Sequence, residues 1–412
     1  MDRYKEILKK NNQEHLLAYI EKASKEQKNA LIKQIEEIDF DELSKLYEIS
    51  TQSKNKAVEG MIIEHIRFTD KYGIPKEKYE ALKEIGNNII KSGKYAAVTM
   101  AGGQGTRLGH TGPKGTFWLN VKGGPKFLFQ ILAESLEKSN KEFNVTVPWY
   151  IMTSTANNDE TVKFFEEHDY FGYGKENVKF FKQNDLPILD ENGKLMVEED
   201  YSIKVAADGN GCIYRAMKEQ GVIDDMKKKG IEWVFVGNVD NAILDMCDPI
   251  LVGLTVSEGN EIGCKSIVKR EPHEKVGAFC KKNGKPGVIE YTELPDEMAE
   301  ERDEDGELLF GEASINHNLY KVSAIEKIAD KKLPYHSAYK KQNYLGIDGK
   351  LVSATEPNSY KYEAYIFDGF GFFDNMSILR GRREEDFAPV KNRVGEDSPD
   401  TAIALYNAKY NL

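Results

Sequence analysis

Residues 95–115 read Tyr-Ala-Ala-Val-Thr-Met-Ala-Gly-Gly-Gln-Gly-Thr-Arg-Leu-Gly-His-Thr-Gly-Pro-Lys-Gly. The first six residues form an apolar run typical of a buried β-strand, and a glycine-rich loop follows at once. Glycines let the main chain turn sharply and approach a ligand closely, so that backbone N–H groups can face anionic oxygens. Arg107 and Lys114 add positive charge to this loop. The stretch therefore predicts a strand and a polyphosphate-binding loop of an α/β protein.

Two common phosphate-binding loops do not match this spacing. A Walker loop reads Gly-x-x-x-x-Gly-Lys-Ser/Thr, whereas here Lys114 follows Pro113 and precedes Gly115. A dinucleotide-binding loop reads Gly-x-Gly-x-x-Gly with an acidic residue about 20 positions further on. This loop has three residues where that pattern has two, and residues 85–133 contain no Asp or Glu. The spacing argues against an ATPase P-loop and against NAD binding.

The composition limits the classes of partner. The chain has 412 residues and a formal net charge of -11. This charge disfavours nucleic acids and anionic membranes as main partners, because both attract basic surfaces. The sequence contains no run of 18 apolar residues that could cross a membrane. Its four cysteines form no Cys-x-x-Cys pair, which predicts reduced thiols in a cytoplasmic protein.

Hydrophobic periodicity divides the chain into parts of different character. Residues 1–94 have apolar positions at helical spacing and predict an N-terminal helical layer, whose last helix runs from Pro75 to about Ser92. From residue 95 to about 255, short β-rich runs alternate with helical stretches, which predicts a Rossmann-like, mostly parallel or mixed sheet covered on both faces. The predicted strands are 96–100, 149–153, 178–182, 233–236, 263–268, 276–280 and 287–291, and the predicted helices of this part are 125–139, 161–168 and 212–229.

Several polar segments follow predicted strands. They are the glycine loop, Gln183, residues 208–211 and Asp240. Because ligands of open α/β sheets bind beyond the carboxyl ends of the strands, we expect these segments to form one crevice. Asp240 supplies a hard carboxylate there, which suits Mg²⁺; a cap for the turn that follows is the alternative role.

The loop sequence resembles a known signature. Gly-Gly-x-Gly-Thr-Arg-Leu followed closely by Pro-Lys is similar to the signature of sugar nucleotidyltransferases. The form Ala-Gly-Gly-Gln-Gly-Thr-Arg-Leu-Gly, with Pro-Lys-Gly four residues further on, resembles the UDP-sugar pyrophosphorylases and most of all the UDP-N-acetylhexosamine pyrophosphorylases. The resemblance implies a nucleotidyltransferase fold of GT-A-like type. Further similar segments are 149–154, 207–211, 239–241, 288–291, 357–361 and 383–392.

The resemblance implies uridylyl transfer from UTP to a hexose 1-phosphate, with UDP-sugar and pyrophosphate as products. N-acetylglucosamine 1-phosphate is the expected acceptor, and glucose 1-phosphate is the alternative. A second alternative is a nucleotide-sugar-binding protein that kept the fold without catalysis. Mg²⁺, for which Mn²⁺ can substitute, is the expected cofactor.

The resemblance also assigns roles to individual residues. Its catalytic residues are Arg107, Lys114 and Lys391. Its UTP-binding residues are Ala101, Gly102, Gly103, Lys114, Gln183, Gly209, Asp240 and Lys361, with Asp240 as the metal ligand. Its sugar-phosphate-binding residues are Asn210, Gly277, Glu290, Ser314 and Lys391.

The chain departs from the family pattern in two places. Where the N-acetylhexosamine enzymes have Asn-Ile-Ala-Asn-His, this chain has Ser314-Ile-Asn-His-Asn, which bears on the choice of sugar. The chain also ends about twenty residues after Lys391, whereas larger relatives continue into a small β-rich domain. The predicted organisation is a helical region over 1–94, a catalytic nucleotide- and sugar-binding α/β domain over 95–345, and a C-terminal segment over 346–412 that completes the site.

Overall fold

The computed structural model describes residues 3–51 and 60–411. It divides into two compact units, each assembled from separate stretches of the chain. The smaller unit draws on residues 1–57, 184–212 and 333–365, and the larger unit on residues 58–183, 213–332 and 366–412. The two units are defined by which residues lie close together in space. The predicted boundaries at residues 94 and 345 were drawn from sequence patterns, and they stay a prediction.

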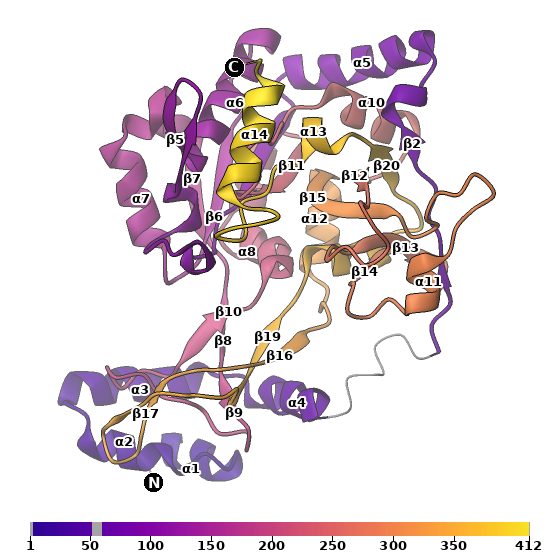
Figure 1. The fold of residues 1–412 in the computed structure, drawn as a ribbon. Coiled ribbons are helices and arrows are strands. Elements are labelled where there is room, and N and C mark those ends of the chain that lie inside the picture. Colours follow the sequence, from indigo (N-terminus) through magenta and orange to yellow (C-terminus); the bar gives the residue numbers. More distant parts are fainter. Residues whose placement is uncertain (1–2, 52–59, 412) are drawn as a thin grey trace. The chain divides into compact units, whose positions relative to one another are not determined.

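The larger unit contains an 11-stranded mixed sheet (Figure 1). Its main path runs β2-β20-β12-β15-β11-β3-β6-β7, and β15 is antiparallel to both of its neighbours, whereas the other pairs on the path are parallel. The strands on this path are β2 (Thr69–Asp70), β3 (Tyr95–Met100), β6 (Trp149–Thr153), β7 (Val178–Lys182), β11 (Trp233–Asn238), β12 (Ile262–Val268), β15 (Glu312–Lys321) and β20 (Ser377–Arg380). The other strands of the sheet are β1 (Ile63–Glu64), β13 (Ala278–Lys282) and β14 (Lys285–Ile289), while β4 (Trp118–Val121) and β5 (Gly124–Phe127) form a separate hairpin.

Helices cover this sheet because its central strands are apolar on both faces. Every residue of β3 and of β6 is buried. Alternate residues such as Ala97 and Ile151 join one large core with residues from five helices, while Tyr150 points to the other face and donates a hydrogen bond to Asp225 over 2.7 Å. The five helices are α5 (Lys76–Lys91), α6 (Leu128–Phe143), α7 (Asn158–Glu167), α10 (Pro249–Ser257) and α14 (Pro399–Lys409). The other helices are α8 (Ile213–Glu219), α9 (Val222–Lys228), α11 (Asp296–Glu300), α12 (Val322–Ala329) and α13 (Arg383–Asp386).

Three predicted helices have different bounds in the structure. The helix predicted at 161–168 runs over Asn158–Glu167. The helix predicted at 125–139 begins at Leu128, because the residues before it pair with β4 as the second strand of a hairpin. The helix predicted at 212–229 is two helices, since Gly221 between them has a left-handed φ of 68°. A residue in that conformation interrupts the helical hydrogen bonding.

The smaller unit combines helices with short antiparallel strands (Figure 1). Its helices are α1 (Arg3–Lys10), α2 (Leu16–Lys22), α3 (Lys25–Glu37) and α4 (Phe40–Thr51). Its strands are β8 (Asp185–Pro187), β9 (Leu189–Asp190), β10 (Val205–Ala207), β16 (His336–Lys340), β17 (Tyr344–Leu345), β18 (Leu351–Val352) and β19 (Ser359–Glu363). Leu31, Ile35 and Tyr362 lie in its own apolar core.

The structure confirms the predicted α/β class with a mostly parallel, mixed sheet. Helices fill most of the N-terminal region as predicted, although β1 and β2 also come from it and residues 52–59 lie outside the described chain. None of the helices in the described residues is long and apolar enough to cross a membrane.

Candidate active site

The glycine loop folds back on itself directly after β3. Gly105 N donates to Gly112 O over 3.0 Å, and Lys114 N donates to Gly103 O over 3.0 Å. Gly109 closes the 3₁₀ turn Thr106–Leu108 with a φ of 72°, a conformation that favours glycine. These bonds hold the loop as a closed hairpin, with Lys114 at its end.

Two amide side chains lie against the start of the loop, and one of them is hydrogen-bonded to it. Asn157, which is 1% exposed, donates from Nδ2 to Ala101 O over 2.9 Å and to Gly103 O over 3.3 Å. Gln183 lies against Gly102 so closely that a Cβ on this glycine would be 2.4 Å from Gln183 Nε2. The structure therefore brings the predicted nucleotide-binding residues Ala101, Gly102, Gly103 and Gln183 together. Asn157 was missed, because an asparagine before a helix usually predicts only an N-cap.

Asp240 lies two residues beyond the end of β11 and meets two of the predicted lysines. Its Oδ2 forms an ion pair of 2.8 Å with Lys114 Nζ. Burial by itself raises the pKa of Asp240, but attraction to Lys114 and Lys391 outweighs burial and lowers this pKa below its ordinary value. The carboxylate is therefore ionised at neutral pH, paired with Lys114 and within electrostatic reach of Lys391.

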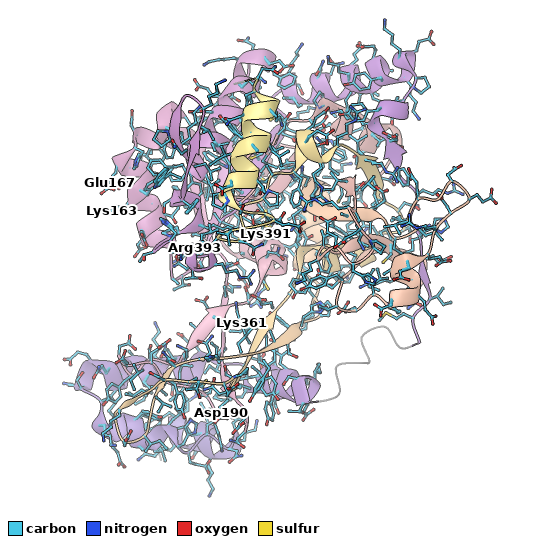
Figure 2. The ribbon with its side chains drawn as sticks, viewed as in Figure 1. Lys163, Glu167, Asp190, Lys361, Lys391 and Arg393 are labelled. Atoms are coloured by element: carbon cyan, nitrogen blue, oxygen red, sulfur yellow. The ribbon has the colours of Figure 1, made fainter. Side chains whose placement is uncertain are left out.

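Lys391 comes from the segment between α13 and α14 (Figure 2). Val390 N donates to Asp240 O over 2.9 Å, which places the two chain segments side by side. The Lys391 ammonium lies 3.6 Å from Asp397 Oδ2 and 5.2 Å from the centre of the Phe387 ring. The structure thus joins Lys114, Asp240 and Lys391, although 277 positions (391 − 114) separate the two lysines in the sequence.

The predicted sugar-binding residues of the larger unit also lie close together. Ser314 N donates to Gly277 O over 2.8 Å. A Cβ on Gly277 would lie 3.2 Å from Glu290 Oε1, so the carboxylate of Glu290 stands beside this glycine. Gly277, Glu290 and Ser314 come from the segments that precede β13, follow β14 and lie within β15. Their proximity depends on strand pairing that spacing alone could not show.

The remaining predicted residues lie elsewhere. Arg107 is exposed on the glycine loop, and its side chain has no hydrogen bond or ion pair within the described part of the chain. Gly209, Asn210 and Lys361 belong to the smaller unit, and Lys361 is labelled in Figure 2. Lys361 pairs there with Glu363 over 2.7 Å. Gly209 has a φ of 96°, and a Cβ there would be 2.3 Å from Ala364 O. The roles of these residues stay predictions.

A buried charged network lies beneath the segment that leads to Lys391. Lys265, which is 2% exposed, forms ion pairs of 2.5 Å with Asp248 Oδ2 and 2.6 Å with Asp386 Oδ1. Burial lowers the pKa of Lys265, but the two carboxylates outweigh this effect and raise it. This network was missed, although a lysine inside the predicted strand 263–268 was its signal.

Asp240 is the carboxylate of this site that could bind Mg²⁺. No group of three or more His, Cys, Asp or Glu side chains able to hold a metal occurs in residues 3–51 and 60–411. Magnesium commonly binds through only one or two carboxylates together with waters and substrate phosphates. A single ionised carboxylate beside a phosphate-type loop fits this requirement, so Asp240 suits Mg²⁺ that arrives with a nucleotide.

Comparisons with known proteins agree over nearly the whole chain. A family model described as UTP--glucose-1-phosphate uridylyltransferase matches residues 39–395. UDP-N-acetylglucosamine pyrophosphorylase of Saccharomyces cerevisiae is 36% identical over 413 residues, which are 97% of this chain and 85% of that protein. UDP-N-acetylglucosamine diphosphorylase 2 of Arabidopsis thaliana is 33% identical over 421 residues, with 97% and 82% covered.

A solved structure gives the same result. The crystal structure of the uridine diphosphate N-acetylglucosamine pyrophosphorylase from Trypanosoma brucei, in complex with an inhibitor, superposes with a TM-score of 0.83 at 31% identity. It covers 97% of this chain and 83% of the other. Together with the family match, these similarities show that the chain belongs to the UTP--glucose-1-phosphate uridylyltransferase family of UDP-sugar pyrophosphorylases.

Proposed function

We propose that the chain catalyses uridylyl transfer from UTP to N-acetylglucosamine 1-phosphate, which yields UDP-N-acetylglucosamine and pyrophosphate. The observation that carries this proposal is the buried, ionised Asp240 next to the glycine loop, which pairs with Lys114 over 2.8 Å and is kept charged in part by Lys391. The printed names of the yeast, plant and trypanosome relatives support N-acetylglucosamine as the sugar.

The reaction exchanges one phosphoanhydride for another. An oxygen of the sugar phosphate attacks the α-phosphorus of UTP and forms a new P–O bond. The bond from the α-phosphorus to the oxygen that bridges to the β-phosphate breaks in line, and pyrophosphate leaves with that electron pair. A phosphate monoester has a second pKa of about 6, so the attacking sugar phosphate is already largely dianionic at neutral pH and needs no general base.

The main obstacle is charge, because two polyanions must meet and a third must leave. Fixed positive groups aimed at the developing charge lower such a barrier. We assign Lys391 to the α-phosphate and the sugar phosphate, and Lys114 to the UTP phosphates. Lys114 pairs with Asp240 over 2.8 Å, so the phosphate oxygens of UTP would compete with this carboxylate for the ammonium group. Arg107, exposed on the glycine loop, is assigned to the leaving pyrophosphate.

Asp240 would hold Mg²⁺, and Mn²⁺ is proposed as a substitute. When bound, the ion would neutralise phosphate oxygens and act as a Lewis acid. The residues of this chain then bind and orient: the glycine loop and Gln183 hold the nucleotide, and Gly209 and Lys361 are assigned to the same ligand. Gln183 offers the donor and acceptor that the imide edge of uracil requires.

The sugar contacts are assigned to Asn210, Gly277, Glu290 and Ser314. Glu290 can accept two hydrogen bonds from sugar hydroxyls, because a carboxylate has two acceptor oxygens. Ser314 is shorter than the asparagine of related enzymes, and one altered pocket contact can change the discrimination between two sugars by about 1–3 kcal/mol.

We further propose a cytoplasmic protein that binds neither nucleic acid nor membrane, in line with its net charge of -11.

The test measures pyrophosphate release from UTP and Mg²⁺ with four acceptors side by side. These are the 1-phosphates of N-acetylglucosamine, glucose, N-acetylgalactosamine and galactose. Release should be fastest with N-acetylglucosamine 1-phosphate, measured as kcat/KM.

The other outcomes have defined meanings. Faster release with glucose 1-phosphate would keep the reaction and overturn the sugar. No release with any of the four, from a folded protein that binds UTP, would replace the enzyme with a nucleotide-sugar-binding protein.

A further inference from the structure

The asparagine that follows Asp240 uses all of its hydrogen-bonding capacity. Asn241 is 2% exposed. Its Nδ2 donates to Asp386 O over 2.7 Å and lies 2.8 Å from His317 Nε2. Its Oδ1 accepts from Ala388 N over 2.9 Å and from Ile243 N over 3.3 Å. An amide side chain has two donor hydrogens and an oxygen with two lone pairs, so no capacity remains for a ligand.

These bonds join the two segments that carry the charged groups of the site. One segment is the end of β11 with Asp240, and the other leads from α13 to Lys391. Main-chain bonds between the same segments support the side chain: Ala242 N donates to Ala388 O over 3.0 Å, and Val390 N donates to Asp240 O over 2.9 Å. Asn241 is thus the side chain at the centre of a junction between segments about 145 residues apart in the sequence.

The partners of Asn241 are themselves fixed. The amide nitrogen can only donate, so His317 Nε2 accepts and its ring is neutral. Burial lowers the pKa of His317 to about 3, in agreement with this geometry. The carboxylate of Asp386 is held by Lys265 over 2.6 Å, while its carbonyl receives the bond from Asn241. A rigid support of this kind sets where the following residues lie.

We propose that Asn241 is a positioning residue that sets the relative placement of Asp240 and Lys391 and acts on uridylyl transfer through them. It contacts no substrate in this role. The inference rests on the proposed function, because the two residues it positions are those assigned to the transferring phosphate. Small displacements of such groups reduce rates strongly, since the reacting atoms must meet in a narrow range of geometries.

The first experiment compares Asn241→Ala with wild type. We expect kcat to fall about 10- to 100-fold, while the KM for UTP changes less than about threefold, as for other residues that support a site from behind. Asn241→Asp keeps the acceptor for Ala388 N but cannot donate to Asp386 O, so its kcat should lie between the two. This second variant also serves if Asn241→Ala does not fold, as judged by circular dichroism.

Asn140→Ala is the matched control. Asn140 lies on α6 of the same unit, away from the site segments, and its Nδ2 donates to Tyr173 Oη over 3.1 Å while its Oδ1 accepts from Val147 N over 2.9 Å. This variant should lose stability in urea as Asn241→Ala does, yet keep kcat within about twofold of wild type. A parallel loss of kcat in both variants would show a general effect of stability and overturn the proposal.

A double-mutant cycle tests whether Asn241 affects kcat through Lys391. If Asn241 acts through Lys391, then Asn241→Ala should lower kcat much less in a Lys391→Ala background than in wild type, because coupled residues are not additive. Equal factors in both backgrounds, or a kcat of folded Asn241→Ala within threefold of wild type, would overturn the proposal. Absence of activity in wild type would instead reject the proposed function, so the two failures differ.

Discussion

At the scale of single residues, the site depends on one buried carboxylate that remains charged. Asp240 is ionised because Lys114 and Lys391 compensate for its removal from water. The same two lysines are those assigned to the phosphates in the proposed reaction. The carboxylate therefore places a fixed negative charge beside Lys114 and within electrostatic reach of Lys391.

Removing Lys391 should lower the rate of uridylyl transfer more than it weakens the binding of UTP. Lys391→Ala should lower kcat by about 100- to 1,000-fold, as the loss of a fixed charge at a transition state does. The Kd for UTP should change much less, because Lys114 and the glycine loop remain. Pyrophosphate release and calorimetric titration measure the two quantities. Lys163→Ala on α7 is the control, because Lys163 pairs at the surface with Glu167 over 3.6 Å (Figure 2). A kcat within threefold of wild type for Lys391→Ala would remove the assigned role.

Neutralising the carboxylate should change the metal requirement. Asp240→Asn should raise the Mg²⁺ concentration for half-maximal activity by at least about tenfold, since even indirect supports of a metal site contribute this much. Binding of metal-free UTP should not weaken, because Lys114 loses its competing anion. Activity titrations with Mg²⁺ and calorimetry in EDTA measure both. An unchanged Mg²⁺ titration would place the metal on another residue.

At the scale of elements, two glycines allow helices to pack with their main chains in contact. A Cβ on Gly86 of α5 would be 2.0 Å from Pro249 O, and a Cβ on Gly253 of α10 would be 1.9 Å from Leu82 O. The pattern of apolar residues predicted the helix over 75–92 but not this close approach, which depends on a segment about 165 residues away.

Adding one methyl group there should separate the helices. Gly86→Ala should lower the free energy of unfolding by about 1–3 kcal/mol or more, as overpacking does. Urea titration followed by tryptophan fluorescence measures this, since Trp118, Trp149 and Trp233 all lie in the larger unit. Gly371→Ala should cost much less, because its nearest neighbour would be 4.0 Å away. Equal stability of the two variants would contradict the packing argument.

A buried triad joins three further elements. Asp248 caps the start of α10, Lys265 lies on β12 and Asp386 ends α13. Burial raises the pKa of each carboxyl, but Lys265 outweighs it and lowers both. The carboxylates therefore contribute stability above their unfolded pKa of about 3.9, and this contribution is lost as the pH falls through their folded values.

Lys265→Met should lower the free energy of unfolding at pH 7 by about 3–5 kcal/mol, because it leaves two buried charges unpaired. Without the lysine, burial should raise both carboxyl pKa values above about 3.9, so the variant should gain stability as the pH falls toward about 4. The difference from wild type, measured in urea, should shrink over that range. Lys71→Met should cost less, since Lys71 lies 3.8 Å from Asp248 and is more exposed. A difference that grows toward pH 4 would contradict this interpretation.

At the scale of the whole molecule, each unit has its own apolar core. Predicted nucleotide-binding residues occur in both units, Gln183 in the larger and Gly209 and Lys361 in the smaller. A ligand that binds the folded chain, and does not bind the unfolded chain, should raise the unfolding temperature.

Thermal unfolding distinguishes the ligand classes. UTP with Mg²⁺ at about 100 times its Kd should stabilise the folded state by about 2.7 kcal/mol, seen as an increase in Tm. CTP should give a smaller increase, because its base lacks the imide edge that Gln183 suits, and NAD should give none. An increase with NAD and none with UTP would contradict the nucleotide assignment.

Much of the fold and part of the site could be predicted from local patterns. Fully buried, mostly apolar strands such as 95–100 and 149–153 are predictable because a sheet covered on both faces needs them. The glycine loop and Asp240 are predictable because each directly follows such a strand. Gly221 shows a limit, since a single left-handed residue divides a helix whose composition reads as continuous.

The sequence by itself determined the α/β class, the phosphate-type loop and, by resemblance, the family. Only the tertiary structure decided how Asn157 holds the loop, how Asn241 joins Asp240 to the Lys391 segment, and how Lys265 lies buried between two carboxylates. The physical reason is the separation in sequence between the residues that make contact. Turns and buried strands follow from neighbours along the chain, whereas these polar contacts join residues that are far apart and meet only when the sheet has formed.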